Sequence, residues 1–441
     1  MRRLLAMAYF FPPLGGGGCQ RTLKLVRYLF PHGWHSTVVT VKDPEYWILD
    51  PSLLQEVPAS CEVLRAGGIT SQRLLRLLGG AGVRVEEPQG ARRPGAFRAL
   101  RRLQQMVAIP DGYRPWARSA GRLAADRIRR GGIDAVWTTS SPESAHLAGL
   151  ALQKEFGLPW IADFRDPWVG RVTYAPPTAW HDRRQRALEG SVIAAADRVT
   201  VVSEAMADRF RARYPGLPAD RFVVLPNGYD PDDWARVADG ERHAAAPRDT
   251  KHFVLLHAGQ LAHRPTVVDL LAAAKRLIEE SPRRRETLRL RFMGGNEGLS
   301  PSDVARAGLE GVVEIVPSRP HLESLSAMKR AGALVLLGHG GDADSQIYTG
   351  KIYEYLTSGR PVIGILDDGP AGALLTASGQ GRACRVGDVS AITEAIRSPL
   401  EAWERGVSVP DSPLPAMAAG WERQTMARRA AELLDSIASR R

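Results

Sequence analysis

A cation and a carboxylate lie close together near residue 350. The stretch TGKIYEYLTSGRPVIG, residues 349–364, follows an apolar run and places Lys351 three positions before Glu354. Side chains three residues apart share one face of a helix. A helix N-terminus with a nearby lysine suits a phosphate, and a carboxylate one turn later can accept hydrogen bonds from ribose hydroxyls. The spacing therefore fits a bound nucleotide, and a plain intrahelical ion pair fits it equally well.

Local signals predict a short helix from about Gly350 to about Gly359. Thr349 is the expected N-cap, Gly359 is the expected residue just past the helix end, and Pro361 prevents the helix from continuing. The face next to the apolar stripe is expected to present Lys351, Glu354 and Ser358.

A second candidate site follows the first apolar run. In YFFPPLGGGG, residues 9–18, four glycines precede a predicted helix. Glycine has no Cβ, so the backbone amides of Gly15, Gly16 and Gly17 could approach a ligand closely. The pattern is neither a Walker loop nor GxGxxG. A purely structural loop is the alternative interpretation.

Composition narrows the classes of protein that fit. A chain of 441 residues is too long for one core and predicts two or three domains. Its three cysteines, Cys19, Cys61 and Cys384, form neither a disulfide framework nor a metal cluster, which indicates a reducing cytoplasm. The apolar start ends in Pro-Pro-Gly without a cleavage pattern, and no apolar run reaches the length of a spanning helix. We expect a soluble cytoplasmic protein.

The positive charge is concentrated in one region. The formal net charge is +11, and residues 92–130 hold eleven arginines against Asp111 and Asp126. Solvated helix faces explain this bias, and so does a docking patch for an anionic acceptor or a peripheral membrane contact. Aromatic residues are not interleaved with the arginines as base stacking requires, so nucleic acid is not an expected partner.

The order of elements predicts an α/β fold. Short apolar runs such as residues 36–41, 135–140 and 333–338 alternate with helical patterns, which indicates parallel sheets covered on both faces. The polar, alanine-rich stretch 235–251 shows no strand or apolar helix pattern. We therefore expect an N-terminal Rossmann-like domain over 1–235, a linker over 236–251, a C-terminal domain over 252–410 and a last helical segment over 411–441.

Several motifs together resemble a known family. The chain is similar over nearly its whole length to the retaining GT-B glycosyltransferases of family 4. The segments that carry this resemblance are YFFPPLGGGG, VTVVSEAMADRF, FVVLPNGYDPDDW, LLHAGQL and TGKIYEYLTSGRPVIG, with PWIADFRDPW over residues 159–168 matching a subset of that family.

The resemblance implies two doubly wound Rossmann-like domains facing a central cleft and a last helix that crosses back to the first domain. It implies a nucleotide-sugar donor on the C-terminal domain, an acceptor on the N-terminal domain and no metal or other cofactor. Arg264 and Lys351 would stabilise the leaving diphosphate, and Arg165 and Asp166 would face the acceptor, although a structural ion pair between these two is equally consistent. The donor-binding residues would be Gly15, Gly16, Gly17, Arg319, Gln346, Thr349, Gly350, Lys351 and Glu354.

The sequence departs from the family pattern at three places. Gln346 stands where the family has the first of two glutamates, which leaves the preferred sugar open. Gln260 and Pro265 replace an arginine and a lysine near the diphosphate, so Arg264 is the substitute candidate. Ser140-Ser141-Pro142 replaces a frequent histidine. Asp342-Ala-Asp344 imitates a metal-binding DxD motif, but its glycine-rich context favours a loop.

The expected activity is transfer of a sugar from a UDP or GDP donor to a small-molecule acceptor, in specialised-metabolite biosynthesis. A lipid-linked envelope glycan is an alternative acceptor. The residues also fit a nucleotide-sugar epimerase or hydrolase of the same fold, and they fit a non-catalytic pseudoenzyme. The sequence leaves the base, the sugar, the acceptor and the oligomeric state open.

Overall fold

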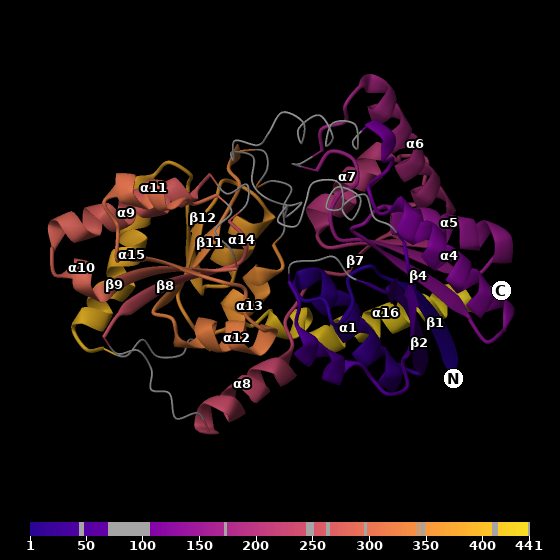
Figure 1. Cartoon of the computed structure of the whole chain (residues 1–441), viewed down its shortest axis with the longest axis horizontal. Helices are drawn as coiled ribbons and strands as arrows, with labels where there is room; N and C mark the ends of the chain where they lie inside the picture. The colour runs from indigo at the N-terminus through magenta and orange to yellow at the C-terminus, as the bar shows by residue number, and fades with distance from the viewer. Residues whose placement is uncertain are drawn as a thin grey trace. The chain divides into compact units, whose positions relative to one another are not determined.

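The chain forms two parallel β-sheets with helices on both faces (Figure 1). The computed structural model describes residues 1–43, 48–68, 106–171, 174–243, 251–261, 265–294, 298–341, 344, 349–407 and 413–439. The expected fold class, an α/β protein with two doubly wound Rossmann-like sheets, is confirmed.

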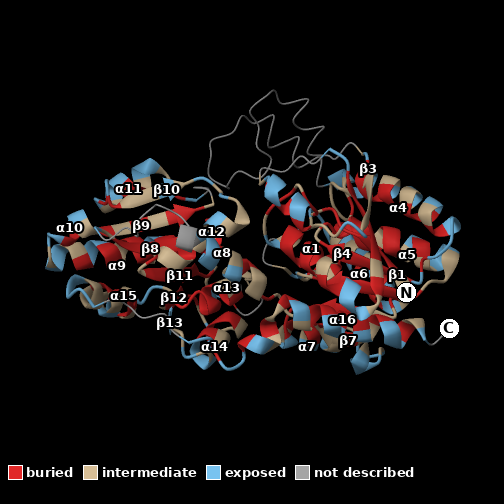
Figure 2. Cartoon of the chain, turned by 90° about the horizontal axis from the view of Figure 1, so that it is seen from below, coloured by how far each residue is buried: buried red, intermediate tan, exposed pale blue. Residues whose placement is uncertain are grey.

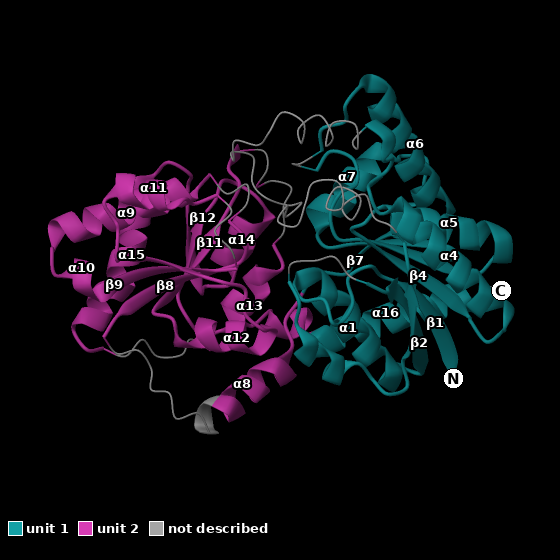
Figure 3. Ribbon diagram, viewed as in Figure 1, with its two compact units in different colours: residues 1–86, 91–227, 423–441 teal, residues 87–90, 228–422 magenta. Residues whose placement is uncertain are grey.

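The chain divides into two compact units (Figure 3). Unit 1 holds the described residues up to Asn227 and those from Arg423 onward, and unit 2 holds the described residues from Gly228 to Glu422. The helix α8 (Pro231–His243) occupies part of the stretch expected to be a linker and belongs to unit 2. Its first turn carries two aspartates that suit the helix dipole, and its buried Val237 lies in a hydrophobic core of unit 2.

The sheet of unit 1 has seven strands in the order β3-β2-β1-β4-β5-β6-β7. Leu4 of β1 is in register with Ser36 of β2 on one side and with Ala135 of β4 on the other. The strands are β1 (Arg2–Met7), β2 (Trp34–Val41), β3 (Glu62–Ala66), β4 (Ala135–Ser140), β5 (Trp160–Phe164), β6 (Arg198–Val201) and β7 (Phe222–Val224). This order places the topological switch point between β1 and β4, where open α/β sheets bind their ligands.

Six helices cover this sheet within the described residues: α1 (Gly17–Leu29), α4 (Arg114–Arg129), α5 (Ser144–Phe156), α6 (Ala179–Ala195), α7 (Glu204–Arg213) and α16 (Arg423–Ala438). Although α16 is the last helix of the chain, it packs against α1. Its Met426, Ala430 and Leu434 share one core cluster with Leu4 and Trp34 of the first two strands. Short 3-10 turns lie at Phe30–His32, Pro51–Glu56, Ala219–Arg221 and Ala418–Trp421.

The sheet of unit 2 repeats this order with six strands, β10-β9-β8-β11-β12-β13. They are β8 (Phe253–Ala258), β9 (Leu288–Met293), β10 (Val313–Val316), β11 (Ala333–Leu337), β12 (Val362–Ile365) and β13 (Gly381–Cys384). Around them lie α8, α9 (Val267–Glu280), α10 (Arg284–Thr287), α11 (Pro301–Ala307), α12 (His321–Arg330), α13 (Lys351–Thr357), α14 (Pro370–Ala377) and α15 (Val389–Glu404). The switch point of this sheet lies between β8 and β11.

Burial follows the layers of each unit (Figure 2). The central strands are buried along their length, whereas the helices expose their outer faces. No helix of the described chain is long and apolar enough to cross a membrane. The mixed sequences EVLRA of β3 and GRAC of β13 lack the continuous apolar run that predicts a buried strand.

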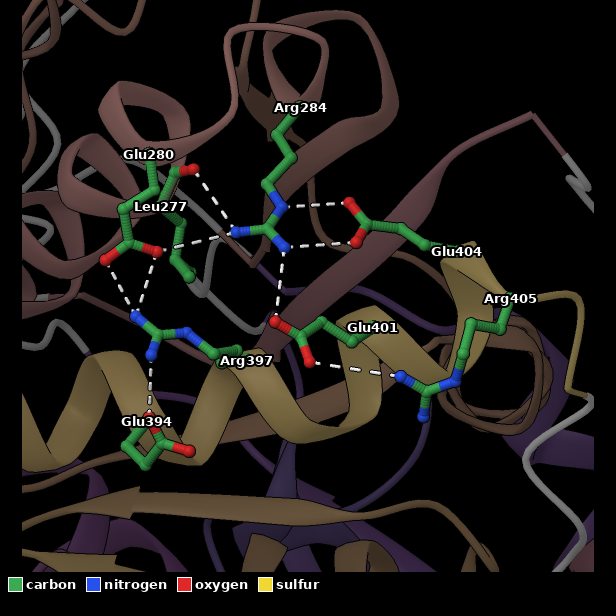
Figure 4. Close-up of polar contacts among 8 residues, drawn as sticks. All are labelled: Leu277, Glu280, Arg284, Glu394, Arg397, Glu401, Glu404 and Arg405. Atoms are coloured by element: carbon green, nitrogen blue, oxygen red, sulfur yellow. Dashed lines mark hydrogen bonds and ion pairs between the residues drawn. The ribbon is translucent and has the colours of Figure 1, made fainter.

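Ion pairs join the helices on one face of unit 2 (Figure 4). The buried Arg284 donates to both carboxylate oxygens of Glu404, at 2.9 and 3.0 Å. Arg397 of α15 donates to both oxygens of Glu280 at 2.7 and 2.9 Å. The bidentate geometry of the Arg284–Glu404 contact favours a fixed packing of α10 on α15, and the Arg397–Glu280 contact joins α9 to the same helix.

Candidate functional site

The glycine loop of unit 1 leads from β1 to α1 at the switch point of the sheet. Gly15 has no room for a side chain, because a Cβ there would lie 2.7 Å from Cγ2 of Ile48. Gly16 has a φ of 85°, which favours glycine. Gly17 begins α1, and a Cβ there would meet no heavy atom within 4 Å. A side chain at Gly17 would therefore have open space, whereas one at Gly15 would not.

Gly18 makes room for Arg165, which follows β5. A Cβ on Gly18 would lie 2.1 Å from Nη1 of Arg165. The guanidinium group donates to the carbonyl oxygen of Ser141 at 2.8 Å and to that of Ser140, and lies 5.6 Å from the ring centre of Phe10. The structure thus brings Arg165 to the glycine loop, as part of the same edge of unit 1.

Charged groups continue along this edge. Asp166 is exposed, and nearby Glu143 is buried and forms an ion pair with Arg171. Asp111 accepts hydrogen bonds from the backbone N–H groups of Tyr113 and Ser144, both at 2.8 Å. Loss of solvent around its carboxylate and the charge of Glu143 raise the pKa of Asp111. Asp166 is thus the most exposed of these three acidic residues.

A buried ion pair behind the edge was not expected from the sequence. Nε and Nη2 of Arg21 donate to the two oxygens of Asp163 at 2.9 and 2.6 Å. Thr139 and Thr200 also donate to this carboxylate, at 2.8 and 2.7 Å. The nearby guanidinium and the hydroxyl donors hold the pKa of Asp163 below its usual value against its burial. The isolated aspartate in the apolar run WIADF was the available signal, since a buried charge requires a partner.

Lys351 and Glu354 open α13 in unit 2. Nζ of Lys351 lies 2.8 Å from Oε2 of Glu354, and their side chains are 34% and 13% exposed. Gly359 has a φ of 78° and follows the helix as expected. The expected N-cap is wrong: Gly350 stands at that position in a helical conformation, and no side chain caps the helix. Ser358 is also misassigned to the polar face, because its buried hydroxyl donates back to the carbonyl oxygen of Tyr355 at 2.7 Å.

Tyr355 ties α13 to the switch point. Its buried hydroxyl oxygen accepts the backbone N–H of Ala258 at 2.7 Å, at the end of β8. The next residue, Gly259, is packed closely: its carbonyl oxygen would lie 2.6 Å from a Cβ on Gly294. The helix that carries Lys351 and Glu354 is therefore fixed to the end of β8.

Asp344, the second acid of the DxD-like segment, organises the adjacent loops. Its carboxylate accepts the backbone N–H groups of His339 at 2.7 Å, Gly340 at 3.1 Å and Asp367 at 2.8 Å. These contacts join the loops that follow β11 and β12. The carboxylate is thus occupied by amides, and the described part of the chain contains no group of three His, Cys, Asp or Glu residues arranged to hold a metal.

The remaining candidates are placed as follows. Arg319 is exposed in the loop after β10. Thr349 precedes α13, and its carbonyl oxygen accepts the backbone N–H of Ile352, the second residue of that helix, at 3.3 Å. Arg264, Gln346 and Asp342 lie outside the described residues.

Comparison with protein-family models gives a match for the N-terminal half of the chain. Residues 16–228 match the family model described as a glycosyl transferase 4-like domain. This range contains part of the glycine loop, the Arg21–Asp163 pair and Arg165. No curated protein sequence matches the chain.

Solved structures with the GT-B fold are similar over the whole chain. Sucrose-phosphate synthase from Thermosynechococcus elongatus is 16% identical with a TM-score of 0.67, covering 100% of both chains. HepE from Anabaena in complex with UDP-glucose is 16% identical, with a TM-score of 0.61 and coverage of 99% of this chain and 100% of that one. An α,α-trehalose-phosphate synthase (UDP-forming) from Burkholderia xenovorans, in complex with glucose-6-phosphate, is 12% identical, with a TM-score of 0.60 and coverage of 99% and 100%. At these identities the likeness shows the fold.

Proposed function

We propose that this protein is a retaining glycosyltransferase that moves a sugar from a UDP or GDP donor to a small-molecule acceptor. The match of residues 16–228 to a glycosyl transferase 4-like domain and the GT-B fold support this class of reaction. The solved structures of similar fold include one in complex with UDP-glucose and one with glucose-6-phosphate.

The observation that carries the proposal is the position of the Lys351–Glu354 pair. The pair stands on α13, and the hydroxyl of Tyr355 on the same helix binds the end of β8 at 2.7 Å. Open α/β sheets bind nucleotides at such an edge. Glu354 would accept the ribose hydroxyls, and Lys351 would face the diphosphate once its contact with Glu354 opens.

The reaction breaks the bond between the anomeric carbon and the diphosphate oxygen and forms a bond to the acceptor on the same face of the sugar. Negative charge grows on the leaving diphosphate in the transition state. Preorganised cations and backbone amides that stabilise this charge lower the barrier. Lys351 and Arg264 are our candidates for the cations. The acceptor proton would pass to an oxygen of the leaving phosphate, so the reaction needs no protein nucleophile.

Arg165 and Asp166 would face the acceptor in unit 1. Asp166 is exposed, and Arg165 is held against the glycine loop by its contacts with Ser140 and Ser141. A lipid-linked acceptor is a second candidate, and it is favoured by the row of exposed arginines on α4.

Calorimetric titration with UDP and with GDP tests the donor site on the wild type and on Glu354→Ala. We expect one nucleotide to bind the wild type and to lose most of its affinity in the variant, because the ribose contacts are removed. Glu323→Ala is the matched control, since it removes a carboxylate from the first turn of α12 in the same unit. Failure of both nucleotides to bind the wild type would contradict the proposal. Turnover of a UDP- or GDP-sugar without any acceptor would indicate a hydrolase or epimerase instead.

A further inference from the structure

Arginines recur every four residues along α4 of unit 1. Arg114, Arg118 and Arg122 are exposed and lie on one side of the helix, because side chains four residues apart share a face. Arg129 continues the row and forms ion pairs with Asp126 at 2.8 Å and with Glu155 at 2.6 Å. Like charges at this spacing repel each other and weaken a helix. The row therefore imposes a cost on α4 that an anionic partner would remove.

The middle of the row has no partner within the protein. Arg118 and Arg122 form no hydrogen bond or ion pair with any residue in the described part of the chain. Arg114 donates to the carbonyl oxygen of Ile109 at 3.1 Å and keeps an exposed side chain. The two acidic groups nearby, Asp126 and Glu155, are both taken by Arg129.

These arginines border a groove between α4 and α5, two helices that lie side by side (Figure 1). The groove has a volume of about 620 Å³. Small residues leave room for it, and a Cβ on Gly121 would already lie 3.4 Å from that of Ala148. The lining includes Ala117, Gly121, Ala125, Ala148 and Ala151. The surface thus combines an apolar floor with a cationic rim.

Exposed apolar side chains lie next to the start of α4. Met106 and Val107 are 51% and 74% exposed, and Trp180 at the start of α6 is 56% exposed. The carbonyl oxygen of Met106 lies 3.0 Å from Nε2 of His181, whose ring packs edge-on against Trp180 at 4.9 Å. A second bond, from Gln185 to the carbonyl oxygen of Pro110 at 2.9 Å, holds this segment against α6. A tryptophan beside cations is the side-chain set that membrane interfaces favour.

We infer that the surface formed by Arg114, Arg118, Arg122, Met106, Val107 and Trp180 docks on the headgroups of an anionic lipid bilayer. The guanidinium groups would bind lipid phosphates in a bidentate manner, and the tryptophan would enter the interface between headgroups and acyl chains. The binding is peripheral, through one side of unit 1. Docking would bring the protein to lipid-linked acceptors, the second acceptor class considered for the proposed transferase, so this consequence rests on the proposed function.

A bilayer explains this surface better than a nucleic acid or a soluble anion does. Base stacking needs aromatic side chains interleaved with the cations, and on α4 the one aromatic residue, Trp116, is buried. A soluble anion would use the arginines but would leave the exposed apolar trio without a role. An anionic bilayer would bind the arginines through its headgroups and the exposed apolar side chains through its interface.

Co-sedimentation with lipid vesicles tests the inference and needs no nucleotide sugar. We expect the full chain to bind phosphatidylcholine vesicles that contain phosphatidylglycerol and to remain in the supernatant with pure phosphatidylcholine. Each basic residue near an anionic surface contributes about a fivefold gain in binding. The double variant Arg118→Glu/Arg122→Glu should therefore bind at least about 25-fold more weakly, and about 1 M salt should have a similar effect, because it shortens the Debye length to about 3 Å.

A charge-matched control separates the surface from the net charge. Arg283→Glu/Arg382→Glu reverses two exposed arginines of unit 2 and should bind vesicles like the wild type. Trp180→Ser should weaken binding while leaving its salt dependence in place. The inference is overturned if the wild type ignores anionic vesicles, if the α4 variant binds as the wild type does, or if the control loses binding equally. None of these outcomes bears on nucleotide binding, so the transferase proposal is tested separately.

Discussion

The guanidinium group of Arg21 holds both carboxylate oxygens of Asp163 inside unit 1, at 2.9 and 2.6 Å. The same group donates to the carbonyl oxygens of Leu225 at 3.0 Å and Pro226 at 3.1 Å, and to the side chain of Asn227 at 3.3 Å. Asn227 is the residue at which the chain leaves unit 1 for unit 2. One buried arginine thus joins the first helix, the fifth strand and the exit of the chain.

Asp163→Ala should destabilise unit 1 strongly. Arg21 is 5% exposed, so the variant would leave a buried cation without its counter-ion. Breaking such a pair from one side costs about 3–5 kcal/mol. Denaturant unfolding followed by fluorescence measures the loss, and Arg21→Met/Asp163→Leu should recover part of it. A single variant within about 1 kcal/mol of the wild type would show that solvent or rearrangement replaces the carboxylate.

Two adjacent glycines should respond in opposite ways to a methyl group. Gly18→Ala should displace the guanidinium group of Arg165 and so impair activity more than folding, because the added Cβ would lie 2.1 Å from its Nη1. Gly17→Ala meets no such obstacle and should leave the stability unchanged or raise it by about 0.4–1 kcal/mol. If the glycine loop binds the donor, Gly17→Ala should still weaken nucleotide binding. Full affinity in a stable Gly17→Ala protein would indicate that the loop is structural.

More of the fold than of the candidate site could be predicted from the sequence. Continuous apolar strands alternating with helices indicate parallel sheets, because burial on both faces leaves a local signal. The partner of Asp163 lies 142 positions away in the chain, and no periodic pattern reports such a contact. The acid within an apolar strand signals that a partner exists, but only the folded chain shows which one it is.

Tyr355→Phe should separate positioning from packing in unit 2. The variant keeps the buried ring but removes the oxygen that accepts the N–H of Ala258. A buried amide left without its partner costs about 1–3 kcal/mol. If α13 binds the nucleotide, affinity for UDP or GDP should also fall, because the helix is no longer fixed to the end of β8. Lys351→Ala is the control: it should weaken binding with little loss of stability, since a surface pair contributes about 0–1 kcal/mol. Unchanged affinity in Tyr355→Phe would mean that the packing of the ring alone positions α13.

His146 should make unit 1 sensitive to acid. The histidine is buried on Phe164 with Nδ1 at 2.7 Å from the hydroxyl of Thr138, and burial lowers its pKa to about 3. A depressed pKa contributes stability that is present above the unfolded value of about 6.5 and is lost as the pH falls toward 3. The stability advantage of the wild type over His146→Leu should shrink by about 2 kcal/mol between pH 7 and pH 5. Parallel stability profiles for the two proteins would show that His146 does not control this dependence.

The DxD-like segment shows why a motif alone decides little about chemistry. Asp342-Ala-Asp344 has the spacing of a metal-binding pair, yet the Asp344 carboxylate accepts three backbone N–H groups from the loops after β11 and β12. A metal-binding DxD motif and this segment have the same spacing of their two acids. What differs is the set of neighbours, and these come from loops that the sequence does not bring together.

The return of α16 to unit 1 has a consequence for synthesis on the ribosome. Met426, Ala430 and Leu434 complete a core that also contains Leu4 of the first strand. Unit 1 is therefore built from both ends of the chain. The whole of unit 2 is translated before α16, the last helix of unit 1, appears. Until α16 is translated, the sheet of unit 1 exposes apolar surface. Exposed apolar surface is the condition under which chains aggregate or bind chaperones. A chain that stops at residue 422 would carry this defect permanently, even though it contains every residue of the candidate site.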